Sequence, residues 1–301
     1  MQAPRQRGVA GDEAGGRTGQ SSGPRGARQR GVAADPYQAI DAQPDPAQFV
    51  QRLEDRGETP TQARLRRRFL RFAGAAPGTR VLEVGSGSGV VCRDLARMVG
   101  PRGRVVGVDP SRTFVHAARR LARRAGLGGR IQFREAGGER LPFRSGRFDV
   151  TVAVTVFLHV RAPEKILAEM VRVTRSGGTV GVQDQDFGTL ALAHPDRHLT
   201  DRILTGVVEH IYPEPHSGRR LPALLAAAGL SRVRLLTDVY QDTTLEPYTQ
   251  TFLEHRAENA VKLGIVDAAV AQSWLDGVTA MARSGGFVMT LNYYGATGVK
   301  P

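Results

Sequence analysis

The sequence predicts an α/β protein with a seven-stranded, mostly parallel sheet, helices on both faces of the sheet and additional helical cap insertions. Two observations carry this prediction. Short apolar runs that are typical of buried strands alternate with longer amphipathic stretches, and such alternation favours a parallel sheet covered by helices. The composition, with 41% hydrophobic and 24% charged residues, is that of a globular protein with a sizeable core.

The first 78 residues divide into a polar tail and two helices. Residues 1–34 are rich in Gly, Arg, Gln and Ser and offer little to bury, so we expect a disordered Arg/Gly-rich tail. The stretches 45–57 and 59–74 carry apolar residues at helical spacing. We therefore expect N-terminal helices within residues 35–78.

Strands and helices alternate over residues 79–187, which we expect to form the ligand-binding core of the sheet. The expected strands cover residues 80–84, 103–109, 130–136, 148–154 and 179–186, and the expected helices cover 89–100, 111–126 and 162–178.

The C-terminal part, residues 188–301, has a less regular pattern. It offers two further strands, at 232–240 and 286–300, and a helix at 218–230. The segments 188–215 and 246–284 are too long to be simple connections. We expect them to form a cap or lid, with two helices in the second segment.

A glycine loop stands where the first strand passes into a helix. Gly85, Gly87 and Gly89 alternate with serines there, at the sheet edge where ligands of open α/β sheets bind. Glycines let a ligand approach the backbone, and the helix start offers free N–H groups. Asp109 ends the second strand and could accept hydrogen bonds from both hydroxyls of a ribose. The pattern fits an adenosine-containing cofactor.

Two details distinguish between such cofactors. The dinucleotide fingerprint Gly-x-Gly-x-x-Gly would need a glycine where Val90 stands, which disfavours a nicotinamide dehydrogenase. Glu83, near the end of the first strand, would repel a pyrophosphate but attract a sulfonium or ammonium group. A cationic, zwitterionic cofactor is therefore favoured.

These motifs resemble those of the class I S-adenosylmethionine-dependent methyltransferases, in the small-molecule group that includes the ubiquinone/menaquinone methyltransferases. The resemblance covers roughly residues 60–190 and implies a Rossmann-like fold and S-adenosyl-L-methionine as cofactor. The matching stretches are "VLEVGSGSG" (81–89), "VVGVDPS" (105–111), "GERLPFRSGRFDVTVAVTVFLHV" (138–160) and "EKILAEMVRVTRSGGTV" (164–180).

The resemblance also implies a cofactor site, residue by residue. Its implied members are Glu83, Gly85, Ser86, Gly87 and Gly89 at the methionine part, Asp109 and Pro110 at the ribose, Gly138 and Glu139 near the adenine, and Thr155 through its backbone. The sequence departs from the family at Gly137, where an Asp often stands beside the adenine. We therefore expect the adenine to be held by backbone N–H groups and packing.

Methyl transfer is an in-line displacement, and a base is needed only when the acceptor must lose a proton. His159 follows the fourth strand and matches the second of two histidines in this subgroup, the first being Leu158 here. Asp184 and Asp186 alternate near the end of the fifth strand. We treat His159 and Asp184 as catalytic candidates. The alternatives are that His159 only forms local hydrogen bonds and that the two acids are turn residues.

Other conspicuous side chains carry weaker expectations. Histidines 194, 210 and 216 are irregularly spaced, so we expect no metal site. His116 and His255 are expected to be surface or packing residues. The single cysteine, Cys92, excludes an internal disulfide and is expected to pack under a helix. Tyr293 and Tyr294 alternate faces of the last strand, so one of them could line the acceptor pocket.

The sequence thus predicts a methyltransferase acting on oxygen, nitrogen or carbon of a small apolar or aromatic metabolite. "TVFLHV" (155–160) replaces the Asn/Asp-Pro-Pro run that suits a base nitrogen, and the resemblance makes secondary metabolism a plausible setting. No apolar run is long enough for a membrane span and no signal peptide is evident, so we expect a cytoplasmic protein.

Two rival functions stay open. The net charge of +13, of which part lies in residues 1–34, would suit a nucleic-acid methyltransferase or an RNA-associated protein. Only 3 of the 42 basic residues are lysines, however, and this bias needs no functional cause. Nucleic acid is therefore not expected to be the main partner. The missing acid at Gly137 would also suit a methyltransferase-like scaffold without catalytic activity. The sequence makes no prediction of the oligomeric state.

Overall fold

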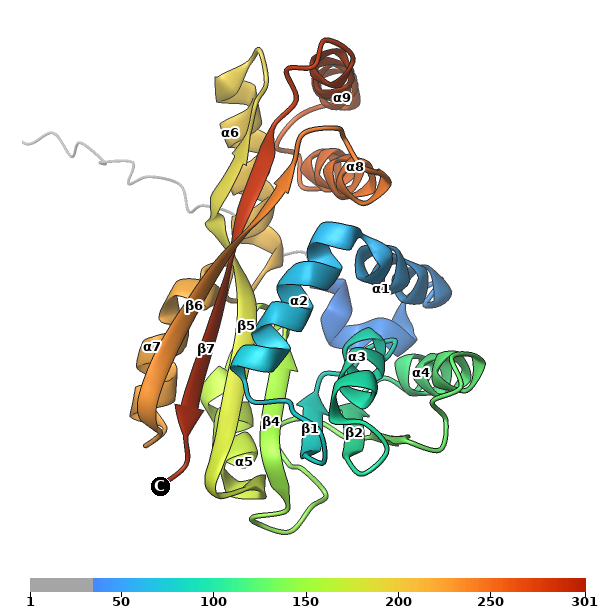
Figure 1. The fold of residues 1–301 in the computed structure, drawn as a ribbon. Coiled ribbons are helices and arrows are strands. Elements are labelled where there is room, and N and C mark those ends of the chain that lie inside the picture. The colour runs from blue at the N-terminus through green and yellow to red at the C-terminus, as the bar shows by residue number, and fades with distance from the viewer. Residues whose placement is uncertain (1–34) are drawn as a thin grey trace, which may run out of the picture. The chain divides into compact units, whose positions relative to one another are not determined.

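The computed structural model describes residues 35–301. They contain a seven-stranded sheet in the order β3-β2-β1-β4-β5-β7-β6. In this order the strands β3, β2, β1, β4 and β5 pair in parallel, whereas β7 runs antiparallel to both of its neighbours, β5 and β6 (Figure 1). The predicted seven-stranded, mostly parallel sheet is confirmed. The expected tail lies outside the described residues.

Most element boundaries agree with the sequence pattern to within a few residues. The strands are β1 (Arg80–Val84), β2 (Arg104–Asp109), β3 (Ile131–Glu135), β4 (Phe148–Val154), β5 (Thr174–Leu192), β6 (Ser231–Asp242) and β7 (Met289–Val299). The helices are η1 (Pro36–Ala42), α1 (Ala47–Glu58), α2 (Pro60–Phe72), α3 (Val90–Val99), α4 (Arg112–Arg124), η2 (Phe157–His159), α5 (Pro163–Val173), α6 (Arg197–Ile211), α7 (Ser217–Ala227), α8 (Pro247–Lys262) and α9 (Ala268–Arg283).

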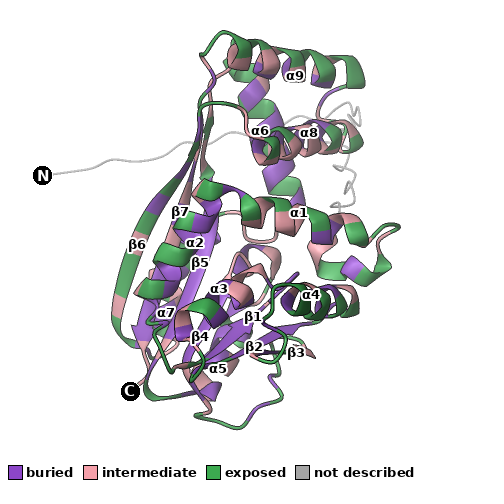
Figure 2. Ribbon diagram, turned by 45° about the vertical axis from the view of Figure 1, so that its right-hand side comes forward, coloured by how far each residue is buried: buried purple, intermediate pink, exposed green. Residues whose placement is uncertain are grey.

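Helices cover both faces of the sheet, and for this reason the central strands are almost wholly apolar. Successive residues of β1 point to opposite faces: Val81 packs with α2, α3 and α4, and Leu82 packs with α5 and α7. Figure 2 shows β6 as the exposed edge of the sheet, in keeping with its many exposed residues.

The last three strands extend beyond the rest of the sheet and carry a helical end. There α6, α8 and α9 lie beyond the rest of the sheet (Figure 1). They pack around the fully buried Trp274, together with Ile203 and Leu253. The expected cap helices are therefore present in the structure.

Strand β5 is longer than predicted at both ends. Residues 174–178 were expected to end a helix, but Thr174 already pairs with Phe148 of β4, and Gly177 has a positive φ of 71° that a helix does not admit. Residues 188–192 were expected in the cap segment, but Ala191 and Leu192 pair with β7. The partner of Thr174 lies 26 residues earlier in the chain, and those of Ala191 and Leu192 lie 99 and 97 residues later, so local periodicity could not reveal the pairing.

The N-terminal segment from Asp35 to Glu58 packs across the start of α4. Ile40 and Phe49 form a small core with Phe114 of α4. The carboxylate of Asp41 accepts hydrogen bonds from the backbone N–H groups of Arg112 and Thr113, which occupies free donors of that helix start. These contacts hold η1 and α1 beside the carboxyl ends of β1 and β2.

Candidate functional site

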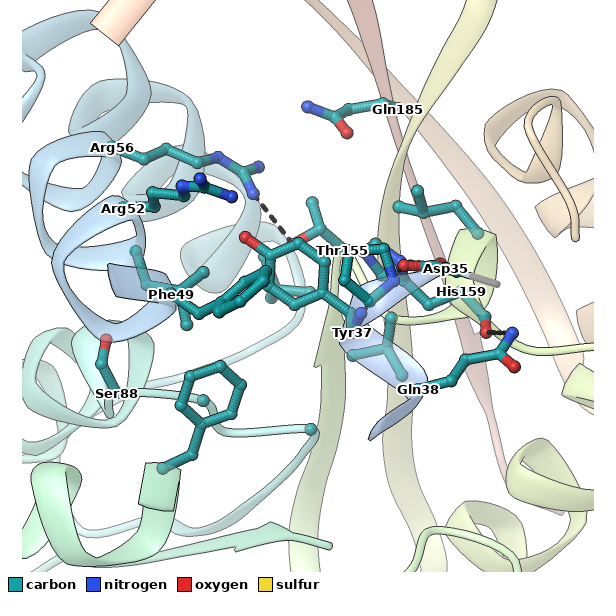
Figure 3. Close-up of a pocket in the computed structure, with 18 of the residues that line it drawn as sticks. Asp35, Tyr37, Gln38, Phe49, Arg52, Arg56, Ser88, Thr155, His159 and Gln185 are labelled. Carbon is teal, nitrogen blue, oxygen red and sulfur yellow. Dashed lines mark hydrogen bonds and ion pairs between the residues drawn. The ribbon is translucent and has the colours of Figure 1, made fainter. Parts of the chain in front are cut away.

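A cavity of about 1050 Å³ opens at the carboxyl ends of β1, β2 and β4. Its floor includes the glycine loop, and its walls come from η1, α1, η2, the end of α6, and α8. Figure 3 shows part of this lining, with Tyr37 of η1 and Arg56 of α1 close to Thr155. Part of the expected cap, α8, thus lines the cavity. The sequence did not predict that η1 and α1 line the cavity. Residues 45–57 show only the apolar spacing of an ordinary amphipathic helix.

Both the backbone conformation and the close packing of neighbouring side chains require glycine in the glycine loop. Gly85, Gly87 and Gly89 have φ values of 74°, 49° and 82°, in the left-handed region that glycine favours. A Cβ atom on Gly85 would approach Val156 to 2.4 Å, and one on Gly89 would approach Phe133 to 2.8 Å. Gly85 and Gly87 line the cavity, whereas Gly89 is packed against Phe133 and does not.

Glu83 lies beneath this loop as a buried acid without a full set of partners. It is 1% exposed, and its Oε2 atom has no hydrogen-bond partner within residues 35–301. Burial raises the pKa of Glu83 to about 8, because a charged carboxylate is poorly solvated there. A cationic group placed in the cavity would reverse this effect, so the site fits a sulfonium or ammonium ligand.

Asp109 fixes the shape of the loop from the end of β2. Its two carboxylate oxygens accept hydrogen bonds from the backbone N–H groups of Gly87, at 2.8 Å, and Ser111, at 3.0 Å. Burial raises the pKa of Asp109 to about 6. Each carboxylate oxygen has a second lone pair, so Asp109 remains able to accept hydrogen bonds from a ligand's hydroxyl groups.

The other residues that the resemblance implies for the cofactor also line the cavity: Ser86, Pro110, Gly138, Glu139 and Thr155. Thr155 has a φ of 55°, a rare conformation for a residue that carries a Cβ. Its backbone N–H donates to the carbonyl of Gln183 at 2.7 Å, and its hydroxyl accepts from Arg56 at 3.2 Å. Gly137 lines the cavity as well, and a Cβ atom there would meet no other atom within 4 Å.

His159 forms the most suggestive pair of the cavity. Its Nδ1 atom lies 2.5 Å from Oδ2 of Asp35, a carboxylate that is itself buried (Figure 3). The imidazole ring lies between the rings of Tyr37 and Tyr212, whose centroids are 4.8 and 5.6 Å from its own. Asp35 was not predicted, since a lone acid at the edge of a polar tail carries no signal in the sequence.

Asp184, the second catalytic candidate, is not among the residues that line the cavity. It is fully buried, and one oxygen accepts hydrogen bonds from the Leu158 N–H and the Ser217 hydroxyl, at 3.1 and 2.8 Å. Burial raises its pKa to about 7. Asp186 is bound by His216 and Arg219. The structure therefore gives both acids bracing roles between β5 and α7.

A hydrogen-bond network around Tyr293 was also not predicted as such. The hydroxyl of this buried tyrosine accepts from Arg56, Gln62 and Gln185, at 3.2, 3.0 and 2.6 Å. Tyr293 lines the cavity and Tyr294 does not, which answers the question left by their alternation. Figure 3 shows Arg56 and Gln185 directed toward the centre of the site.

The remaining expectations concern Cys92, the histidines and the membrane. Cys92 is buried in α3, as expected, and His255 lines the cavity from α8, which was not. Within the described part of the chain, no group of three His, Cys, Asp or Glu side chains could hold a metal ion. No helix in that part is both long and apolar enough to cross a membrane.

Comparison with known sequences agrees with the motifs. Residues 82–182 match the family model described as a methyltransferase domain. An uncharacterized 37.1 kDa protein in transposon TN4556 of Streptomyces fradiae is 32% identical over 217 residues, which are 68% of this chain and 59% of that protein. The ubiquinone/menaquinone biosynthesis C-methyltransferase UbiE of Ectopseudomonas mendocina is 36% identical over 116 residues, or 38% and 45%. The chain thus spans about half the length of these curated relatives.

Comparison with solved structures agrees with the fold. The YcgJ protein from Bacillus subtilis superposes with a TM-score of 0.53 at 17% identity, over 79% of this chain and 98% of that one. The [4+2]-cyclase SpnF gives a TM-score of 0.50 at 23% identity, over 80% and 82%. At these identities the likeness establishes the architecture and leaves the reaction to be argued from the site.

Proposed function

Because the chain carries a methyltransferase domain of the class I S-adenosylmethionine-dependent family, we propose that it transfers a methyl group from S-adenosylmethionine to a small-molecule acceptor. The observation that carries this proposal is that one cavity joins the glycine loop and Glu83 to His159 and the aromatic side chains of the cap. Such a cavity has room for a cofactor and an acceptor side by side.

The residues present suit this cofactor. Glu83 would face its positive charge, and Asp109 would accept from the ribose hydroxyls. Arg56, which contacts Thr155 at the end of β4, would bind the carboxylate of the methionine part. Among the described residues Arg56 has no carboxylate within 4 Å, so its charge is available to a ligand.

The reaction would need little chemistry from the protein. S-adenosylmethionine supplies an already activated methyl group, so the chain has to align the acceptor and exclude water. The cavity walls formed by η1, α1 and α8 would hold the acceptor in place and exclude water. Rings of Tyr37, Phe187, Tyr212 and Phe252 lie along the wall, which favours an aromatic or apolar acceptor.

His159 would act as the base for an acceptor that must lose a proton. If Nδ1–H donates to the Asp35 carboxylate, the lone pair of Nε2 is left to take the proton. The same carboxylate would then stabilise the imidazolium that forms. Asp184, which binds the Leu158 N–H next to His159, would act as a positioning residue.

Ligand-dependent stability tests the cofactor assignment directly. S-adenosylhomocysteine at about 100 times its Kd should add about 2.7 kcal/mol to the free energy of unfolding and raise the Tm by several degrees, whereas NADH should not. The variant Asp109→Asn should lose most of this shift, and the exposed Asp201→Asn should keep it. No shift for the unmodified protein would contradict the proposed function.

The two rival functions predict other results. An RNA-associated protein should retain RNA binding at about 200 mM salt and lose it when residues 1–34 are deleted. A scaffold without activity should bind S-adenosylhomocysteine yet transfer no methyl group to any acceptor that binds beside it.

A further inference from the structure

Among the residues that the structure describes, Arg256 is a buried cation without an acidic partner. It lies on α8, is 3% exposed and lines the cavity. Its Nε atom has no hydrogen-bond partner, and no carboxylate of residues 35–301 lies within 4 Å of its guanidinium. Glu258 also lines the cavity and is two residues away in the sequence, but it pairs with Lys262 instead. Its Oε2 atom lies 3.9 Å from Nζ of that lysine.

Aromatic rings surround the guanidinium of Arg256. Its Cζ atom lies 4.6 Å from the ring centre of Phe252, 4.8 Å from that of Phe187 and 5.2 Å from that of Tyr212. Within residues 35–301 its side chain forms one hydrogen bond, which is long, at 3.4 Å to the Tyr212 hydroxyl. Such rings attract a cation but do not use its N–H donors, so a buried arginine of this kind retains donors that an anion could satisfy.

We propose that Arg256 binds an anionic group of the methyl acceptor. This inference rests on the proposed function and narrows its substrate class from an apolar or aromatic metabolite to an aromatic or apolar acid. A planar guanidinium offers paired N–H donors that match a carboxylate or a phosphate. The ring faces around it would hold the body of the acceptor.

Tyr212 lies beside both Arg256 and His159. Its ring centre is 5.2 Å from Cζ of Arg256 and 5.6 Å from the ring centre of His159. One acceptor could therefore contact Arg256 with its acidic group and His159 with the atom that is methylated.

The anion that Arg256 would bind differs from the carboxylate of the cofactor, which would be bound by Arg56. Arg56 contacts Thr155 and Tyr293 and so lies at the end of β4, next to the glycine loop. Arg256 instead contacts Phe187 of β5, Tyr212 after α6, and Phe252 of α8. Two arginines on different elements thus provide for two different anionic groups.

The test uses benzoate, phenyl phosphate and the neutral benzamide as probes of the full-length protein, alone and saturated with S-adenosylhomocysteine. Binding is followed by ligand-observed NMR or calorimetry. Benzoate or phenyl phosphate should bind roughly tenfold or more tightly than benzamide. A preference between the two anions identifies a carboxylate or a phosphate as the acidic group.

Variants connect this preference to Arg256. Arg256→Met should abolish it while retaining the S-adenosylhomocysteine affinity, and should not lower the Tm, since it removes an unpaired buried charge. Arg256→Lys should retain part of the preference, and the exposed Arg202→Met should retain all of it. Equal binding of benzoate and benzamide, or a preference that survives in Arg256→Met, would overturn the inference. So would a large fall in the Tm of Arg256→Met together with complete loss of the preference in Arg256→Lys, which would assign Arg256 a structural role.

The two proposals fail separately. Absence of a Tm shift with S-adenosylhomocysteine in the unmodified protein would contradict the proposed function. The preference for benzoate or phenyl phosphate over benzamide is measured on the ligand-free protein and does not depend on S-adenosylhomocysteine binding.

Discussion

The Nδ1 atom of His159 and the Oδ2 atom of Asp35 lie 2.5 Å apart, although the residues are separated by 124 positions in the chain. One partner follows the fourth strand of the core, and the other precedes η1. The carbonyl of His159 also accepts a hydrogen bond from the Gln38 side chain, at 2.8 Å. The N-terminal segment is thereby joined twice to the candidate base.

This pair leads to a prediction about turnover. We expect His159→Ala to slow methyl transfer by about a hundredfold to ten-thousandfold, because it removes the base, and Asp35→Asn to slow it by about tenfold or more. Rates are measured with labelled S-adenosylmethionine and a hydroxylated analogue of the anion that passes the binding test above, so that the hydroxyl group accepts the methyl group and loses its proton to His159. The affinity for S-adenosylhomocysteine, measured by calorimetry, should change little. Equal losses of affinity and rate would assign His159 to the cofactor instead.

A second prediction concerns proton release. Glu83 has a pKa of about 8 in the ligand-free protein and is therefore mostly protonated near neutral pH. A cation bound beside it lowers that pKa, so binding of S-adenosylmethionine should release a proton. Calorimetry in buffers of different ionisation enthalpy measures this release. The variant Glu83→Gln should bind more weakly and release none. The same release in that variant would place the cation elsewhere.

A third prediction concerns stability without ligand. The pKa values of Glu83 and Asp184 are raised by burial to about 8 and about 7, above the values of unfolded chains. The folded state therefore holds these protons more tightly. Their contribution to stability is complete below the unfolded pKa of about 4 and is lost as the pH rises through about 7 and 8.

Thermal unfolding of the ligand-free protein checks this sign. The Tm should fall as the pH rises through that range, and Glu83→Gln should show a smaller fall because its amide does not ionise. A Tm that rises over the same range would contradict the assigned direction.

A fourth prediction concerns how backbone conformation and crowding in the glycine loop affect stability. Gly85→Ala should lower the free energy of unfolding by about 2–4 kcal/mol, because Gly85 has a positive φ and its Cβ would approach Val156 to 2.4 Å. Adding Val156→Ala should restore part of the loss. Gly137→Ala, with open space around it, should change stability by less than about 1 kcal/mol. Chemical denaturation measures all three.

The same open space allows a gain in function. The family often has an Asp where Gly137 stands, and here the position lines the cavity without crowding. We expect Gly137→Asp to strengthen S-adenosylhomocysteine binding by about 1 kcal/mol through a hydrogen bond to the ligand. Calorimetry of the variant beside Gly137→Ala measures this. Equal affinities of the two variants would mean that the adenine lies elsewhere.

The sequence predicted the core well, since a parallel strand is visible in its apolar run and its ligand loop in adjacent glycines. Glu83, Asp109 and Thr155 could be located because each lies within such a local pattern. Asp35, Arg56 and Arg256 could not, because their importance depends on partners from distant segments. The extra length of β5 was missed for the same reason, as its last residues are strand only by pairing with β7.

The pairing of β7 with both β5 and β6 also determines which part of the enclosure can open. The helices α6, α8 and α9 are joined to the sheet through paired strands, which leave no simple hinge between them and the core. The segment 35–58 is attached mainly by side-chain contacts at the ends of strands. We therefore expect this segment, rather than the helical end, to move when ligands enter or leave. Such a movement would separate Asp35 from His159, so the base would be complete only while the segment is in place.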